Sequence, residues 1–335
     1  MGDVGGCLRQ IRSFARTAID RVIPPGLPCA VLDFPHHSNV GDSAIWLGEM
    51  AYCKMANRRV SYVSSVYSYS ESVLRRSMPN GVVLFHGGGN FGSLWPLHQR
   101  HREEVLRTLR DYPVIQLPQS LYFGEDRDCF ERTAGLIAQH PDFTLLVRDK
   151  SSEDLGLRLG ARTVLCPDSA IFLAGALHRA APEVDFYGLT RSDKECAGGV
   201  WPSPPTGYTA AFGDWVDEPE HLLAGGLSML QRRAHGRLGH QRWFQLALRR
   251  AFDSVAWSRV RRGVRQLSRG RVVVTDRLHA HLLSQLLDIP HVVLDNHYGK
   301  IHRYMDCWDD GSTARCNDVL DMWSSALDQL RCNGR

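Results

Sequence analysis

The sequence predicts an α/β protein of two domains, each built on a parallel sheet. The chain has 335 residues, which exceeds the usual size of a single domain. With 43% hydrophobic and 23% charged residues, it has the composition of an ordinary globular protein and enough apolar side chains for two cores. Short apolar runs alternate with stretches of helical periodicity, and parallel strands require such crossover connections.

The first half of the chain accounts for one sheet. Its apolar runs end at proline, glycine or polar residues and alternate with polar-faced helical stretches, a pattern typical of βαβ units. An amphipathic helix at residues 8–22 precedes them. The predicted strands are residues 29–34, 59–64, 82–85, 113–117, 144–147 and 163–165, and the predicted helices are residues 43–56, 98–110 and 130–139.

The second half is predicted to contain a second sheet. A Gly- and Pro-rich segment at about 174–219 contains the expected boundary, so we predict an N-terminal domain at residues 1–180 and a C-terminal domain at residues 181–335. The later part of this half carries a clear βαβ pattern. Its predicted elements are strands at residues 186–189, 271–274 and 291–294, and helices within residues 220–266, 278–287 and 319–330.

The positive charge of the chain is unevenly distributed. The net charge of +4 is too small to indicate nucleic-acid binding, but twelve arginines lie between Gln231 and Arg271 against one acid, Asp253. Tryptophan and phenylalanine residues are interleaved with them. Such a segment is usually a solvated helical face, and it also fits peripheral contact with an anionic membrane through residues 231–271. The segment has no nucleic-acid recognition motif, so we expect no nucleic-acid partner.

The cysteines and the apolar runs bear on the location of the protein. The nine cysteines are scattered, without a C-x-x-C pair or a spacing typical of metal sites, so we expect no bound metal and a reducing compartment. The sequence has no run of about 18 apolar residues that would predict a membrane span, and no secretory signal is recognisable. We therefore predict a cytoplasmic protein, at the inner face of the membrane if the basic segment binds lipid.

Polar and charged residues cluster where the predicted strands end. In open α/β sheets, ligands bind beyond the carboxyl ends of the strands, where loops lead into helix N-termini. Six strand ends carry such residues, which predicts one shared cleft. These ends contain Asn39 to Asp42, His86 to Asn90, Gln119 and Ser120, Arg148 and Asp149, Asp276 to His279, and Asp295, Asn296 and Lys300.

Three of these motifs also have simple structural explanations. The glycines from Gly87 to Gly89 let the backbone approach a ligand or bind an anion, but they also suit a tight strand-to-helix turn. Asp42 either lines the cleft or caps a helix that starts at Ser43. Arg148 either forms a local ion pair or faces an anion, because a buried strand seldom ends in an arginine without one.

Arg277 and His279 form the strongest candidate pair. They lie in the first turn of a helix that follows an apolar VVV strand. There the helix dipole and free N–H groups favour an anion, and arginine adds a planar fork for carboxylate or phosphate. Histidine can exchange a proton near neutral pH. His281, by contrast, is expected to be a packing residue.

Six motifs taken together resemble those of the polysaccharide pyruvyl transferase family. They cover both halves of the chain in order, from about residue 30 to residue 310, and residues 196–268 match least. The motifs are DFPHHSNVGDSAIW (residues 33–46), FHGGGNFGSLWPLHQRHRE (85–103), IQLPQSLYF (115–123), LLVRDKSS (145–152), VVTDRLHAHLL (273–283) and PHVVLDNHYGKI (290–301).

The resemblance implies a fold, a donor and a product. The fold would be similar to that of GT-B glycosyltransferases, with two Rossmann-like domains facing each other across a cleft. Phosphoenolpyruvate would be the co-substrate and a cyclic pyruvate ketal the product, without a metal or another cofactor. The acceptor would be a sugar residue of a bacterial exopolysaccharide, cell-wall glycan or glycolipid, either free or lipid-linked.

The resemblance also implies roles for the cleft residues. His279 would protonate the vinyl carbon of phosphoenolpyruvate as a general acid, and Asp42 or Asp168 would accept the hydroxyl proton. The N-terminal domain would bind the acceptor and the C-terminal domain the donor. The donor-binding residues would be Arg148, Arg277, Leu278, His279, Asn296 and Lys300, and the acceptor-side residues Asn39, Asp42, His86, Gly88, Gly89, Asn90, Gln119 and Ser120.

Two other functions stay open at this point. A sugar-nucleotide glycosyltransferase of the same fold would need a base-binding pocket and pyrophosphate contacts in the C-terminal domain, and the sequence suggests neither. The other alternative is a non-catalytic subunit that binds glycan or lipid in an export complex. The set of Arg148, Arg277 and His279 argues against that alternative, because a binding protein has no need of the acid.

Overall fold

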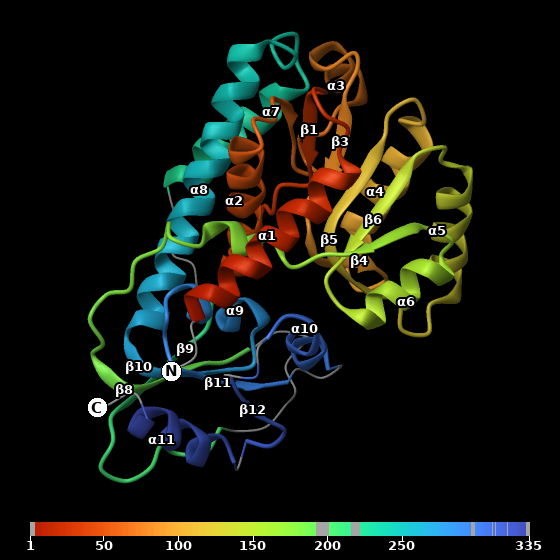
Figure 1. Cartoon of the computed structure of the whole chain (residues 1–335). Helices are drawn as coiled ribbons and strands as arrows, with labels where there is room; N and C mark the ends of the chain where they lie inside the picture. Colours follow the sequence, from red (N-terminus) through yellow and green to blue (C-terminus); the bar gives the residue numbers. More distant parts are fainter. Residues whose placement is uncertain are drawn as a thin grey trace.

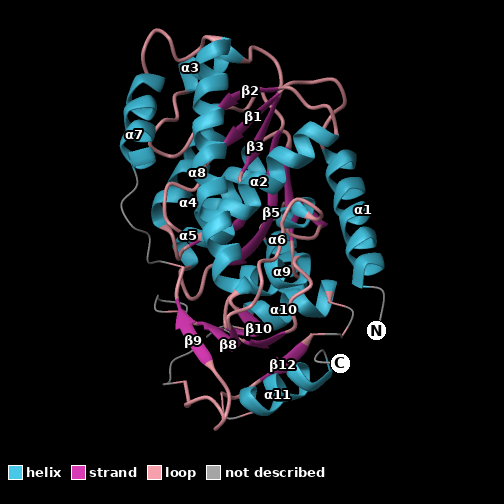
Figure 2. Cartoon of the chain, turned by 90° about the vertical axis from the view of Figure 1, so that its left-hand side faces the viewer, coloured by secondary structure: helices cyan, strands magenta, loops and turns pink. Residues whose placement is uncertain are grey.

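The chain forms two parallel sheets. The computed structural model describes residues 4–191, 201–215, 222–295, 299–309, 311, 313–319 and 321–332. Figures 1 and 2 show the larger sheet above and the smaller sheet below, with α9 and α10 between them. The predicted α/β class with parallel sheets is confirmed. Within the described ranges, no helix combines the length and apolar character needed to cross a lipid bilayer.

The larger sheet has seven strands, and the path along it runs β2-β1-β3-β5-β6-β7, with β4 pairing with β5. The strand order reverses direction between β1 and β3, and the carboxyl ends of the strands point toward one edge of the sheet. In sheets of this kind, that edge next to the reversal is where ligands bind. The strands are β1 (Cys29–Leu32), β2 (Val60–Val63), β3 (Val82–Phe85), β4 (Gly88–Gly92), β5 (Val114–Tyr122), β6 (Phe143–Val147) and β7 (Arg162–Leu165).

Helices cover both faces of the larger sheet. Alternate strand residues point to opposite faces, so Val31 and Leu84 join one core cluster while Leu32 and Phe85 join another. The first cluster packs against α1, α2 and α8, and the second against α3, α4 and α5. The helices of this half are α1 (Val4–Val22), α2 (Val40–Met55), α3 (Glu71–Ser77), α4 (Pro96–Thr108), α5 (Arg127–Gln139), α6 (Lys150–Arg158) and the short 3-10 helix η1 (Ser169–Leu173).

Among the residues that the structure describes, the smaller sheet has five strands in the order β12-β11-β10-β8-β9. One face packs against α11 and the other against α8 and α9. The strands are β8 (Val184–Leu189), β9 (Ala210–Gly213), β10 (Gly270–Thr275), β11 (His291–Leu294) and β12 (Ala314–Cys316), and the helices are α7 (Leu222–Ala234), α8 (Arg242–Ser268), α9 (Leu278–Leu286), α10 (Lys300–Trp308) and α11 (Met322–Cys332).

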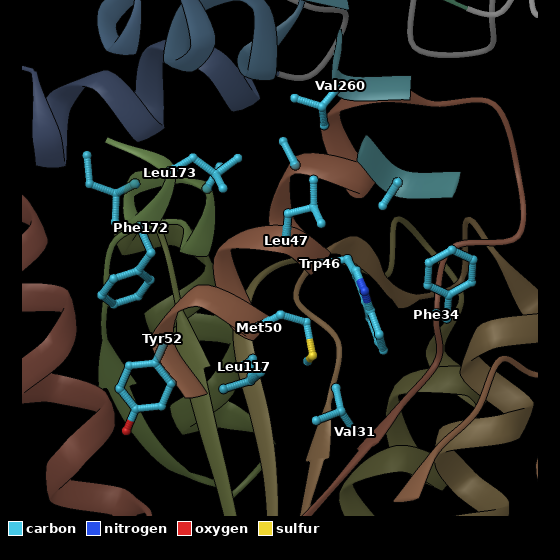
Figure 3. Close-up of a cluster of buried hydrophobic side chains, with 14 of the residues drawn as sticks. Val31, Phe34, Trp46, Leu47, Met50, Tyr52, Leu117, Phe172, Leu173 and Val260 are labelled. Atoms are coloured by element: carbon cyan, nitrogen blue, oxygen red, sulfur yellow. The ribbon is translucent and has the colours of Figure 1, made fainter. Parts of the chain in front are cut away.

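Helix α8 follows the smaller sheet's first strands in the chain and packs on both sheets. The ring of Phe252 in α8 stacks on that of Phe34 at 4.0 Å between centroids, and the indole N–H of Trp46 donates to Asp253 at 2.9 Å. Figure 3 shows Val260 of α8 in the same cluster as Trp46 and Leu47 of α2. Helix α8 thus joins the two halves of the molecule. The domain boundary predicted between residues 180 and 181 stays a prediction.

Three strands were not expected from the sequence, and β4 is the one that bears on the site. Gly88 and Gly92, which begin and end β4, have positive φ values of 122° and 112°. Three of its five residues are glycines, so the strand has neither an alternating apolar pattern nor β-branched residues. The other two, β9 and β12, are only four and three residues long.

The packing of α2 against η1 depends on Gly48. A Cβ at this position would overlap the carbonyl oxygen of Ser169, and overpacking of this kind costs about 1–3 kcal/mol. We expect Gly48→Ala to lower the free energy of unfolding by about 2 kcal/mol, measured by urea denaturation. Gly135 in the middle of α5 is a matched control, because no atom lies within 4 Å of a Cβ there. Gly135→Ala should raise stability by about 0.5–1 kcal/mol. Equal effects of the two changes would contradict the packing argument.

Candidate active site

A cavity of about 310 Å³ is lined by residues from both sheets. It is bounded by loops after β1, β3 and β6 of the larger sheet, and by the first residues of α9 and α10 of the smaller sheet. The structure thus brings together strand ends that are far apart in sequence. Ten of the predicted site residues line the cavity: Asn39, Asp42, His86, Gly89, Asn90, Arg148, Arg277, Leu278, His279 and Lys300.

Four other predicted residues are described but lie outside the lining. Gly88 packs beneath Asp42, whose Oδ1 would be 3.3 Å from a Cβ at this glycine. Gln119, Ser120 and Asp168 lie behind the cavity wall, where they contact lining residues. Asn296 falls outside the described residues.

Arg148 is fully buried at the end of β6. Its Nη1 forms an ion pair with Asp168 Oδ2, and its Nε donates to Ser120 Oγ at 2.9 Å. Among the described residues, its Nη2 has no hydrogen-bond partner. A buried guanidinium whose N–H lacks a hydrogen-bond partner costs free energy, so Nη2 of Arg148 is suited to donate to an anionic ligand.

Two cations meet at Gly89. A Cβ on this residue would overlap the Nζ atom of Lys300 and lie 3.5 Å from Nη2 of Arg148. Lys300 comes from the smaller sheet's half of the chain and Arg148 from the larger sheet. The missing side chain at Gly89 therefore leaves room for both cations at one point of the cavity wall.

Arg277 is the third cation in the wall. It immediately precedes α9, and its backbone N–H donates to Thr275 Oγ1 at 3.1 Å. Its guanidinium is buried and forms an ion pair with Asp214, which follows β9. Neighbouring acids thus orient both buried arginines, and these ion pairs compensate the free-energy cost of burying the two guanidinium charges.

His279 lies in the first turn of α9, and its two ring nitrogens have different surroundings. Nε2 is 3.3 Å from Asp168 Oδ2, while a Cβ at Gly41 would overlap Nδ1. Burial alone would raise the pKa of Asp168, but His279 and Arg148 hold it below its ordinary value. The carboxylate of Asp168 therefore stays ionised next to Nε2 of His279.

Asp42 does not cap its helix, so that alternative is wrong. Helix α2 begins at Val40, and Asn39 is its N-cap, accepting from the Gly41 N–H at 2.8 Å. Asp42 instead lines the cavity, with His37 Nε2 at 3.6 Å from its Oδ2. Burial alone would raise the pKa of Asp42, but His37, His279 and other cations lower it. An ionised carboxylate thus faces the cavity.

Two histidine–carboxylate pairs support the wall, and of their four residues only His86 had a role predicted from the sequence. His98 Nδ1 is 2.7 Å from Asp33 Oδ1, and His86 Nδ1 is 2.8 Å from Glu49 Oε2. Asp33 has a positive φ of 71° and is almost fully buried. Burial would lower the pKa of His86, but Glu49 raises it above its ordinary value. The cavity residues without a predicted role are Asp33, Pro35, His37, Ser38, Trp95, His98, Arg191, Trp215 and Ile301.

A buried network holds Asn90 in place. Asn90 Oδ1 accepts from Arg102 and from Gln119, both at 2.8 Å, and its Nδ2 donates to Asp33 at 3.0 Å. Gln119 therefore supports the wall from behind rather than facing a ligand. Burial lowers the pKa of Arg102 to about 10.

His281 packs away from the cavity, as expected. Its Nδ1 is 2.9 Å from Nε2 of His291, and both rings are buried. Across the described part of the chain, no group of three or more His, Cys, Asp or Glu side chains could hold a metal ion.

The contacts of Asp168 with His279 and Arg148 make stability depend on pH in the acid range. Because these contacts lower the folded pKa of Asp168 from an ordinary value of 3.8, the ionised carboxylate stabilises the folded state above about pH 4. This stabilisation is lost as the pH falls further. Asp168→Asn should lower the free energy of unfolding at pH 7 by about 3–5 kcal/mol, since Arg148 is left buried without its acid.

Denaturation at several pH values measures this effect. The variant should lose less stability than the unchanged protein between pH 7 and the acid range, while Asp154→Asn, at an exposed position of α6, should behave like the unchanged protein. Parallel stability curves for the Asp168 variant and the unchanged protein would contradict the assignment.

Comparisons with known proteins cover most of the chain. The family model described as polysaccharide pyruvyl transferase matches residues 39–298. "Pyruvyl transferase 1" of Schizosaccharomyces pombe is 32% identical over 317 residues, which cover 90% of this chain and 75% of that protein. "Putative pyruvyl transferase EpsO" of Bacillus subtilis is 28% identical over 298 residues, covering 87% and 88%.

A solved structure shows a related fold. It is that of a functionally uncharacterized protein from Klebsiella pneumoniae, with a TM-score of 0.58 and 15% sequence identity. The match covers 92% of this chain and 99% of the other. At this identity, the likeness concerns the fold alone.

Proposed function

The chain belongs to the polysaccharide pyruvyl transferase family and is an enzyme of that class, and we propose that it takes the pyruvyl group from phosphoenolpyruvate. The acceptor is a sugar residue of a bacterial surface glycan, and the product is a cyclic pyruvate ketal with release of phosphate. The observation that carries this proposal is the convergence of Arg148 and Lys300 at Gly89, with Arg277 in the same cavity.

The three cations suit the charge of the donor. Phosphoenolpyruvate carries a carboxylate and a phosphate, so its site needs several positive groups directed at one small volume. Arg148 supplies an N–H that has no partner among the described residues, and guanidinium groups bind carboxylate and phosphate in a planar, two-point manner. Lys300 adds a compact charge, and the backbone at Leu278 lies at the N-terminus of α9, where anions are favoured. Asn296 stays in the proposed donor set.

His279 is the proposed general acid. A proton moves from its imidazolium to the vinyl CH₂ of the donor, which becomes the methyl group of the ketal. A sugar hydroxyl attacks the adjacent carbon, the bond from that carbon to the phosphate oxygen breaks, and a second hydroxyl closes the ring. One hydroxyl proton restores the imidazolium and the other leaves with phosphate. Asp168 holds the imidazole in place from behind.

The wall from the larger sheet is proposed to bind the acceptor. Asp42 lines the cavity as an ionised carboxylate and is the candidate to accept a hydroxyl proton. Asp168 is less suited to this role, because its two carboxylate oxygens already contact the Ala170 N–H, Arg148 and His279. The remaining acceptor-side residues in the wall provide polar contacts for a sugar: the side chains of Asn39, His86 and Asn90 and the backbone at Gly89. Gly88, Gln119 and Ser120 support this wall from outside the lining, through their contacts with Asp42, Asn90 and Arg148.

The fold and location are part of the same proposal. We interpret the two sheets as the Rossmann-like domains of a GT-B-like fold, with residues 1–180 on the acceptor side and residues 181–335 on the donor side. The described cysteines are free thiols, which supports a cytoplasmic location. A lipid-linked acceptor would place the enzyme at the inner face of the membrane.

One experiment separates this function from its alternatives. Incubation with phosphoenolpyruvate and a panel of glycosides, followed by mass detection, should show a product heavier by one pyruvyl ketal together with free phosphate. Calorimetry with a panel of sugar nucleotides in place of phosphoenolpyruvate should show no binding. Sugar-nucleotide binding would favour a glycosyltransferase, and glycan binding without turnover would favour a non-catalytic subunit.

Arg148 can be tested by donor binding. Arg148→Lys keeps the charge but removes the two-point contact, so we expect the Kd for phosphoenolpyruvate, measured by calorimetry, to rise by about tenfold to a hundredfold. Arg162→Lys, at an exposed position of β7, is the control and should leave the Kd unchanged. An unchanged Kd in a folded Arg148 variant would remove this residue from the donor site.

His279 can be tested by turnover. His279→Gln should lower kcat for ketal formation by about 10²–10⁴, the usual contribution of a general acid, with a smaller effect on the Kd for phosphoenolpyruvate. Phosphate release and ketal mass report the two halves of the reaction. Near-normal kcat in this variant would mean that another group supplies the proton.

A further inference from the structure

The segment from residue 222 to residue 250 forms one end of the molecule. It contains α7, a turn and the first turns of α8. Figures 1 and 2 show α3 and α7 at the end opposite to β12 and α11. The proposed pyruvyl transfer does not use this end, so its composition calls for a separate explanation.

This end is strongly basic. Residues 222–250 contain six arginines and no aspartate or glutamate. One of the six, Arg249, lies near Asp253 at 3.6 Å, and within the described ranges no ion pair with a carboxylate is found for the other five. By contrast, Arg269 at the far end of α8 pairs with Glu183 at 2.9 Å. The five are Arg232, Arg233, Arg237, Arg242 and Arg250, and all are exposed.

Large apolar side chains are exposed among these arginines. Trp243 is 58% exposed and Leu238 52%, although side chains of this kind are usually buried. Met229 and Leu246 are also exposed, at 51% and 44%. We call the surface made by these four residues and the five exposed arginines the basic tip.

A second cavity, of about 370 Å³, adjoins the basic tip. It lies between β2, the edge strand of the larger sheet, and the start of α8. Gln245 Oε1 joins the two walls by accepting from the Val63 N–H at 2.9 Å. Its lining includes three arginines and the exposed tryptophan: Arg59, Arg242, Arg249 and Trp243.

The arginines, the exposed apolar side chains and the adjoining cavity together favour one kind of binding partner for the basic tip. A purely solvated face would carry charges of both signs and few large apolar residues. Arginines interleaved with tryptophan, leucine and methionine, without acids, complement a surface that is anionic at its headgroups and apolar just beneath them. The arginine-lined cavity offers room for one such headgroup next to the apolar side chains.

We propose that the basic tip rests on an anionic bilayer surface and that the adjoining cavity takes an anionic lipid headgroup. Trp243 and Leu246 enter the interfacial layer, and Arg59, Arg242 and Arg249 surround the headgroup phosphate. This inference goes beyond the proposed pyruvyl transfer and does not depend on it, because lipid binding can be measured without any sugar acceptor.

Vesicle flotation tests the proposal with the full chain. Vesicles with about 30 mol % phosphatidylglycerol should bind the protein, and vesicles of phosphatidylcholine alone should bind it much more weakly, because each arginine near an anionic surface contributes about fivefold in affinity. Raising the salt from about 0.1 M to about 0.5 M should weaken binding by shortening the range of the charges.

Two double variants that remove the same charge separate the tip from the rest of α8. Arg237→Gln with Arg242→Gln should weaken binding by about 25-fold. Arg261→Gln with Arg265→Gln, at exposed positions nearer the other end of α8, should change binding by less than about twofold. Equal losses in the two variants would mean that net charge alone drives binding, and the tip assignment would fail.

Tryptophan fluorescence tests the insertion. Lipids brominated in the acyl chains should quench part of the emission, and Trp243→Phe should remove that quenching while preserving flotation. Quenching that persists in Trp243→Phe would overturn the orientation. If inorganic phosphate binds to the cavity but vesicles do not bind to the protein, the cavity is an anion site without a membrane role and the proposal fails.

The outcome of these vesicle-binding experiments does not depend on catalysis. Ketal formation on a free glycoside should be unchanged in the two double variants and in Trp243→Phe, so a failure of lipid binding leaves the proposed function standing. Gel filtration provides the last distinction: if the tip variants change the oligomeric state instead of vesicle binding, the surface is an interface between copies of the chain.

Discussion

A guanidinium buried at the carboxyl edge of the larger sheet is the constraint on which the rest of the structure depends. Arg148 is fully buried, and a buried charge without partners costs more free energy than a marginally stable fold can supply. Asp168 and Ser120 compensate part of it, while Nη2 has no partner among the described residues. An anionic donor would complete the compensation, which explains in physical terms why the proposed donor site lies at this strand end.

The same acid joins the two halves of the molecule. Asp168 precedes η1, beyond the larger sheet, and its Oδ2 contacts both Arg148 and His279 of α9. Helix α2 also lies close to both α9 and η1, and two glycines allow this: a Cβ at Gly41 would overlap His279, and one at Gly48 would overlap the carbonyl oxygen of Ser169 in η1. Gly41 in the first motif is therefore a packing requirement of the proposed acid.

Strand ends could be predicted from the sequence because parallel topology brings them to one edge, and most of the predicted cavity wall follows from that rule. Contacts between side chains that lie far apart in the chain could not be predicted in this way. Asp33 and His98 are 65 positions apart, and nothing local indicates that they meet. The helix that follows β1 was expected to start at Ser43, but Asn39 caps it, since asparagine caps as well as aspartate does. Strand β4 has no side-chain pattern that a sequence could reveal.

The basic segment shows most clearly what composition leaves undecided. Its arginines look alike in sequence, yet Arg259 and Arg262 donate to the carbonyls of Pro35 and Ser38 and so support the cavity wall, while those of the basic tip face solvent. A helix rises 1.5 Å per residue, so Arg242 and Arg259 lie about 25 Å apart along α8. If the basic tip rests on a bilayer, α8 holds the candidate active-site cavity at about that distance from the lipid. A lipid-linked acceptor must then project equally far, which favours an extended oligosaccharide over a single sugar on its carrier.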